Sequence, residues 1–275
     1  MPPGKRTNSS PMLSLLLTYL LFLLLVFLVQ RKIIYFPETF PQQRLAELAS
    51  QLGLQAWPTA ENYRGFISQD TKVGSKGSIV VFHGNAGSAI RRSYYIDALE
   101  RLGYRVILAE YPGYGARPGP ISEKILIDDG IRTTKMVLQE FSGPLFLWGE
   151  SLGSGVVAGI VASGQVPVAG IALITPFDSL ANVAQHHYWY LLAKWLVKDK
   201  FNNIEYLGDY QGYSAMIIAH EDDIIPNARS LKLYDALSGQ KKLWEFEQSG
   251  HNDLPMHPKQ AWWHEVMAFI DPRDQ

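Results

Sequence analysis

Cysteine is absent from this chain of 275 residues. Without a thiol, the protein cannot form a disulfide, use a cysteine nucleophile or bind a metal through thiolates. An excess of charge is absent too, because 25 Lys and Arg oppose 26 Asp and Glu for a formal net charge of −1. With no basic stripe interleaved with aromatic residues, the sequence does not predict nucleic acid as a partner. Its hydrophobic content of 47% is ordinary for a globular protein with a sizeable core.

One stretch near the N-terminus carries no charge at all. Residues 12–29 read MLSLLLTYLLFLLLVFLV, about 18 residues, which is close to the length needed to cross a bilayer. A secretory signal peptide usually has a shorter apolar region and a cleavage site of small residues, and the following LVQRKIIYFP offers no such site. We therefore predict an uncleaved single-pass membrane anchor over residues 12–30 behind a short tail over residues 1–11. A cleaved signal peptide is the alternative.

The basic residues on either side of this anchor give only a small bias to its orientation. Lys5 and Arg6 precede it, and Arg31 and Lys32 follow it. Because these counts are equal, the positive-inside rule depends on the amino terminus alone, which favours an inner tail. We expect the bulk of the chain outside the cytoplasm, and the absence of cysteine points the same way.

After the anchor, the sequence divides into a connector and one domain. Residues 31–62 predict a connector with a short helix that ends at Gly53. Residues 63–275 alternate short apolar runs with segments of helical periodicity. This alternation predicts an α/β domain whose mostly parallel, twisted sheet has helices on both faces. The predicted strands cover residues 77–84, 104–113, 144–149, 168–177, 214–221 and 241–248.

The sequence Gly-Glu-Ser-Leu-Gly lies between one of these strands and the helix predicted after it. It matches the pattern G-x-S-x-G, in which a sharp strand-to-helix turn presents a serine above the sheet edge. Ser151 is that serine, and Gly149 and Gly153 leave room for the turn. The pattern is common by chance, so an inert glycine-serine loop is the alternative. The flanking strand and helix favour a nucleophile, with the positive end of the helix facing it.

A serine nucleophile needs a base and an acid, and both occur downstream in the order that this arrangement requires. AHEDDIIP follows one predicted strand at residues 219–226, and SGHND follows the last one at residues 249–253. The first offers Asp222 or Asp223 as the acid, and the second offers His251 as the base. His257 is a weaker candidate base because it precedes Pro258 at the predicted start of the last helix.

With these motifs in place, the chain resembles the α/β-hydrolase superfamily, and within it the membrane-anchored serine hydrolases of the abhydrolase-domain type. The resemblance covers nearly all of the chain after the anchor. The stretches that carry it are VVFHGNAGS (80–88), LAEYPGYGARPG (108–119), GESLGSG (149–155), AHEDDIIP and SGHND.

The resemblance implies a role for each matching residue. Ser151 corresponds to the nucleophile and His251 to the base. The acid of such proteins stands four places before a proline, which selects Asp222 over Asp223. The backbone N–H groups of Asn85 and Leu152 would form the oxyanion hole.

The resemblance also bears on the remaining histidines and on cofactors. His83 would orient the oxyanion loop, and neither a metal nor an organic cofactor would be needed. The pair His186 and His187 lacks the carboxylate spacing of metal motifs such as H-E-x-x-H, so we predict no metal site there.

Residues 178–213 interrupt the alternation of strands and helices, and in this fold such an insertion often forms a lid. Tyr188, Trp189 and Trp195 make it strongly aromatic. Three interpretations are open: these side chains pack on the domain, line an acyl pocket, or dip into the membrane interface, where Trp and Tyr are enriched.

Taken together, these features predict a serine hydrolase that cleaves an ester or thioester through an acyl-enzyme intermediate. Its expected partners are the lipid bilayer and a small-molecule or lipid-like ester substrate. A serine peptidase of related fold is one alternative, although the propeller domain common in the prolyl-oligopeptidase group has no room here. A catalytically inactive, membrane-tethered binding protein is the other.

Overall fold

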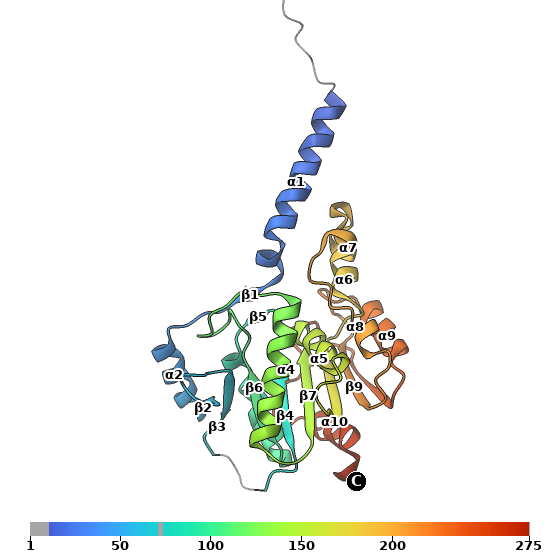
Figure 1. The fold of residues 1–275 in the computed structure, drawn as a ribbon. Coiled ribbons are helices and arrows are strands. Elements are labelled where there is room, and N and C mark those ends of the chain that lie inside the picture. The colour runs from blue at the N-terminus through green and yellow to red at the C-terminus, as the bar shows by residue number, and fades with distance from the viewer. Residues whose placement is uncertain (1–10, 71–73, 275) are drawn as a thin grey trace, which may run out of the picture.

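The structure is a computed structural model that describes residues 11–70 and 74–274. A single eight-stranded sheet runs through its centre (Figure 1). Its strands lie in the order β10-β9-β8-β7-β4-β6-β3-β2, and every neighbouring pair from β10 to β6 is parallel. β3 and β2 add antiparallel pairs at one edge. The strands are β2 (Leu54–Trp57), β3 (Gly65–Ser68), β4 (Ser78–Phe82), β6 (Arg105–Ala109), β7 (Leu145–Glu150), β8 (Gly170–Ile174), β9 (Tyr213–Ala219) and β10 (Lys241–Phe246).

Helices cover both faces of the sheet, which confirms the predicted α/β class with a mostly parallel sheet. The central strands are buried on both sides, so successive side chains point into two hydrophobic clusters on opposite faces of the sheet. In β4, Val80 and Phe82 belong to the first cluster, and Ile79 and Val81 belong to the second. The first cluster includes residues of α4 (Glu123–Glu140), α5 (Leu152–Ala162), α8 (Asn203–Leu207) and α9 (Asn227–Ala236). The second includes residues of α2 (Gln42–Gln51), α3 (Tyr94–Leu99) and α10 (Trp262–Ile270).

The segment predicted as a connector, residues 31–62, differs from the prediction because part of it packs with the folded domain. α2 buries Leu45 and Ala49 against the sheet. β2 pairs with β3 as the edge strand and buries Leu54 and Trp57, while Gln55 is exposed. The domain therefore begins upstream of residue 63, the predicted boundary. β2 was missed because a four-residue edge strand without β-branched residues carries little strand signal.

The predicted anchor is the helix α1 (Pro11–Ile34), which stands away from the body of the domain (Figure 1). It is long and apolar enough to cross a membrane, judged by its length and composition. Except for Pro11, which begins α1, the predicted tail lies outside the described residues. Beyond α1, the short strand β1 (Phe36–Pro37) pairs in parallel with β5 (Ala86–Gly87), next to the loop that follows β4.

Candidate active site

Ser151 occupies the single-residue turn between β7 and α5. Its backbone has φ 51° and ψ −113°, in the left-handed half of conformational space that residues with a Cβ rarely adopt. The turn is fixed by three hydrogen bonds: the Ser151 N–H donates to the Ile174 carbonyl at 2.8 Å, and Ser154 donates to the Ser151 carbonyl through its N–H at 2.9 Å and its hydroxyl at 2.6 Å. The surroundings thus hold a strained serine in place.

The two glycines of the motif are required by close backbone approach. A Cβ on Gly149 would lie 2.6 Å from the Gly153 carbonyl oxygen. A Cβ on Gly153 would lie 2.0 Å from the Phe82 carbonyl oxygen, on neighbouring β4. Both positions therefore exclude any side chain, and this tight crossing sets α5 directly behind the turn.

His251 and Asp222 meet Ser151 from two separate loops. The Ser151 hydroxyl lies 3.0 Å from His251 Nε2, and His251 Nδ1 lies 2.7 Å from Asp222 Oδ2. The other oxygen of Asp222 accepts the N–H groups of Ile224 and Ile225 at 2.9 and 2.7 Å. The carboxylate side chain is 2% exposed, whereas Asp223 is exposed to solvent. Because a carboxylate only accepts, His251 donates from Nδ1 and presents Nε2 as an acceptor to the serine.

The loop after β4 carries Asn85, and several hydrogen bonds hold it rigid. The Asn85 carbonyl accepts the Phe36 N–H at 3.0 Å and the Tyr114 hydroxyl at 2.8 Å. Buried His83 contacts the Gly84 carbonyl at 2.8 Å and the Glu110 carboxylate at 3.0 Å. Leu152, the other predicted oxyanion residue, is the first residue of α5, where a backbone N–H has no partner within the helix.

Arg92 and Glu150 form an ion pair beside the site that the sequence analysis did not single out. Two guanidinium nitrogens of Arg92 donate to the Glu150 carboxylate at 2.7 and 3.2 Å, and Tyr94 and Tyr95 donate to the same group. Burial opposes ionisation of Glu150, but the adjacent guanidinium outweighs it and holds the pKa of Glu150 below its ordinary value. In the sequence, the one indication of this ion pair was Glu150, a charged residue inside the serine motif.

A pocket of about 270 Å³ opens next to His251. Its lining consists of Arg92, Tyr94, Glu150, Ile174, His251, Asn252, Leu254 and Met256. The aromatic residues of the insertion are absent from this lining. Tyr188 is 45% exposed, and Trp189 and Trp195 are each 69% exposed, so a large part of each side chain lies at the surface.

The strain at Ser151 predicts an unusual stability difference between two variants at this position. Ser151→Gly should exceed Ser151→Ala in its free energy of unfolding by about 1 kcal/mol, because glycine adopts positive φ without a steric cost. Denaturant unfolding of the full chain in detergent measures both. The matched pair is Ser163→Gly and Ser163→Ala, at a position with φ −63°, where the order should reverse. Equal stabilities at position 151 would mean that the turn stores no strain.

Comparison with known proteins defines the class of this chain. The family model described as serine aminopeptidase, S33, matches residues 74–215. Rv2307c, an uncharacterized protein of Mycobacterium tuberculosis, is 31% identical over 229 residues, which cover 82% of this chain and 81% of the relative. The lysophosphatidylserine lipase ABHD12 of Danio rerio is 30% identical over 184 residues, 60% of this chain but only 48% of that protein.

Solved structures agree on the fold. One of the metagenome-derived lipolytic enzymes LipS and LipT superposes with a TM-score of 0.58 at 20% identity, covering 74% of this chain and 96% of that one. The monoacylglycerol lipase of Paleococcus ferrophilus gives 0.53 at 18% identity, with coverages of 72% and 94%. The fold and the matching family model define an α/β-hydrolase enzyme. Within that class, the chain belongs to the family whose model is described as serine aminopeptidase, S33.

Proposed function

We propose that this protein is a membrane-anchored serine hydrolase that cleaves a lipid-like acyl ester with Ser151, His251 and Asp222 as its catalytic triad. The observation that carries the proposal is the continuous hydrogen-bonded series from the Ser151 hydroxyl through His251 to Asp222, at 3.0 and 2.7 Å. Contacts of this length let the imidazole take the serine proton while the carboxylate stabilises the resulting charge.

Ser151 and His251 carry out the bond-forming and proton-transfer steps of the reaction. Ser151 Oγ attacks the ester carbonyl carbon as its proton passes to His251 Nε2. The N–H groups of Asn85 and Leu152 receive the negative charge that develops on the carbonyl oxygen, assisted by the positive end of α5. His251 then gives its proton to the leaving alcohol, and an acyl-Ser151 ester forms. A water molecule deprotonated by His251 hydrolyses that ester, releases the acid and regenerates the serine.

The anchor is attached directly to this machinery. The Asn85 side chain donates to the carbonyl of Ile34, the last residue of α1, at 2.8 Å. In the next turn of chain, the Phe36 N–H donates to the Asn85 carbonyl. With α1 in a bilayer, the oxyanion loop would lie close to the membrane surface. This placement suits a substrate whose acyl chain resides in the membrane, and several relatives are named as lipases.

The pocket favours an ester over an aminopeptidase substrate. An aminopeptidase needs an anionic group to hold the amino terminus of its substrate. Among the described residues, Glu150 is the one carboxylate that lines the pocket beside His251, and Arg92 already pairs with it. Neutral or single-chain lipid esters need no such counter-ion.

The substrate class is tested on the purified full chain in detergent micelles. A monoacyl glycerol or lysophospholipid should be hydrolysed with a higher kcat/KM than an aminoacyl amide that carries a free amino terminus. Ser151→Ala should abolish both activities. A higher kcat/KM for the amide would favour the peptidase alternative. Turnover of neither substrate, together with no labelling by an active-serine probe, would favour the inactive binding protein.

A further inference from the structure

The insertion after β8 projects from the domain as an arm next to α1 (Figure 1). The arm comprises α6 (Leu180–His187), the 3-10 turn η3 (Trp189–Leu191) and α7 (Ala193–Leu196), and it returns to the domain at Asp199. The side chains at its tip are exposed to an unusual degree for apolar groups: Tyr188, Trp189, Tyr190, Leu192 and Trp195, each between 43% and 69%. Soluble surfaces rarely leave such a cluster uncovered.

The arm lies along the anchor helix and is bonded to it at two levels. At the tip, the Tyr19 hydroxyl donates to the Tyr190 carbonyl at 2.6 Å. Lower down, the Gln30 side chain donates to the Leu196 carbonyl at 3.2 Å and accepts the Lys198 N–H at 2.7 Å. These bonds hold the arm alongside the helix from Gln30 to Tyr19.

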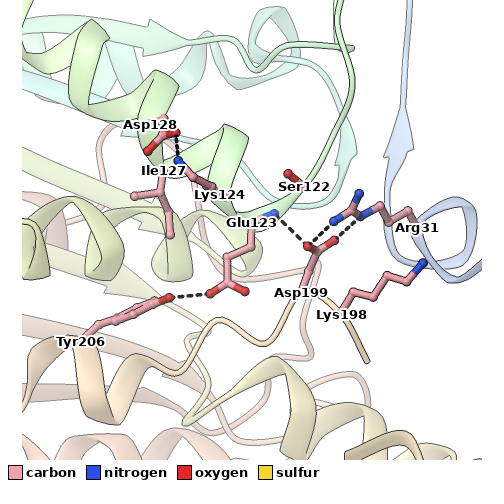
Figure 2. Close-up of a pocket in the computed structure, with 9 residues that line it drawn as sticks. All are labelled: Arg31, Ser122, Glu123, Lys124, Ile127, Asp128, Lys198, Asp199 and Tyr206. Atoms are coloured by element: carbon pink, nitrogen blue, oxygen red, sulfur yellow. Dashed lines mark hydrogen bonds and ion pairs between the residues drawn. The ribbon is translucent and has the colours of Figure 1, made fainter. Parts of the chain in front are cut away.

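A charged joint fixes the base of the arm to the base of the helix (Figure 2). Buried Asp199 accepts two bonds from the Arg31 guanidinium at 2.8 and 2.9 Å, and one from the Glu123 N–H at 3.2 Å. The Lys198 ammonium lies 4.1 Å from the centre of the Phe27 ring. Charged groups therefore gather at the base and apolar groups at the tip, which is the order expected for a segment that passes from water into hydrocarbon, where charge is costly.

The position of Tyr190 beside Tyr19 sets how deep the tip would reach. With the charged joint at the membrane surface, Tyr19 lies 12 residues further along α1 than Arg31 (31 − 19), or about 18 Å at the helical rise per residue. The hydrocarbon core of a bilayer is about 30 Å thick. The tip would thus reach roughly the middle of the core without crossing it.

Several backbone polar groups at the tip have hydrogen-bond partners within the protein, as an environment without water requires. Gln185 donates to the Trp189 carbonyl at 3.3 Å and accepts the Lys194 N–H at 3.0 Å, so one side chain satisfies both ends of the turn. The Tyr190 carbonyl has the Tyr19 hydroxyl as its donor. Irregular backbone survives at membrane depth only when its polar groups are paired within the protein. The long stem of exposed Lys194 lets its ammonium extend toward the headgroups.

We infer that the arm over residues 180–199 is a second membrane element, which inserts beside α1 as far as Tyr19 and ends within the bilayer. The inference rests on the anchoring role of α1 in the proposed function. The occupant of the aromatic surface is lipid rather than a partner protein, because the surface continues the apolar face of a helix that is itself lipid-exposed. Since His187 Nε2 donates to the Ile224 carbonyl at 2.9 Å, the arm also connects the bilayer to the loop that carries Asp222.

The native tryptophans provide the test without a foreign label. Of the seven tryptophans, Trp189 and Trp195 are the two that are exposed; the others are 8% exposed or less. We reconstitute the full chain in phosphatidylcholine vesicles whose acyl chains carry bromine near their middle. Emission should be quenched relative to unbrominated vesicles, and the variant Trp189→Phe/Trp195→Phe should lose that quenching. Iodide in the buffer should quench neither residue.

Two tryptophans added to the double-Phe background calibrate the measurement. Leu21→Trp, on exposed α1, should be quenched by the brominated lipid, and Leu52→Trp, exposed on the domain, should be quenched by iodide instead. If Leu21→Trp is quenched but Trp189 and Trp195 respond only to iodide, the arm lies in water and the inference is overturned. If Leu21→Trp responds only to iodide, the anchor itself fails and the inference fails with it. None of these fluorescence measurements depends on hydrolase activity. A failure of the proposed chemistry would therefore be detected in the activity assays and not here.

Discussion

Replacing Ser151 with alanine is expected to lower kcat for ester hydrolysis by about a millionfold, to the level left by substrate binding and the oxyanion donors. The change removes the attacking oxygen and little else, because the Ser151 backbone bonds to Ile174 and Ser154 do not involve its hydroxyl. KM should change little, since uniform binding contacts are kept. Initial rates on a monoacyl ester in detergent measure the effect.

Ser163→Ala is the matched control for this prediction. Ser163 lies at the C-terminal end of the same helix, where its hydroxyl donates to the Ile160 carbonyl. Its loss should leave kcat unchanged. A Ser151→Ala enzyme that keeps a substantial fraction of the parent rate would mean that another group performs the attack.

Replacing Asp222 with asparagine is expected to lower kcat by about ten-thousandfold, because it holds His251 in the wrong tautomer. The two backbone N–H groups of Ile224 and Ile225 require an acceptor and would bind the amide oxygen of the new side chain. Its NH2 group would then face His251 Nδ1, which must become the acceptor. The proton moves to Nε2, where it points at Ser151 and blocks proton removal.

The neighbouring acid is the matched control for position 222. Asp223→Asn makes the same chemical change at an exposed carboxylate, so kcat and KM should both stay at the parent values. A large loss of kcat in Asp223→Asn with a small loss in Asp222→Asn would mean that Asp223 is the acid of the triad. Equal losses at both would indicate a general effect of charge near the site rather than control of the tautomer.

Elements that depend on residues close together in the chain could be predicted from the sequence. The predicted strand over residues 77–84 contains β4, and the helix predicted directly after the serine motif is α5. The serine motif marked its turn because glycine alone fits the two crossings described above. These features depend on neighbours in the chain and can be predicted from it.

Other features depend on partners far away in the chain and could not be predicted in the same way. β3 is four residues long and pairs with β6 about forty residues later, so its strand character comes from the sheet rather than from its composition. Arg92 and Glu150 lie 58 residues apart, and Tyr19 and Tyr190 lie 171 apart. The aromatic composition of the arm suggested several environments, and its placement beside α1 favours one of them.

Covalent labelling identifies the serine that attacks the substrate. The full chain is treated with a fluorophosphonate, digested and analysed by mass spectrometry. We expect a single phosphonylated residue, Ser151, and a much slower reaction in His251→Ala, because the imidazole no longer takes the serine proton. An adduct on another serine, or an unlabelled parent protein, would contradict this expectation.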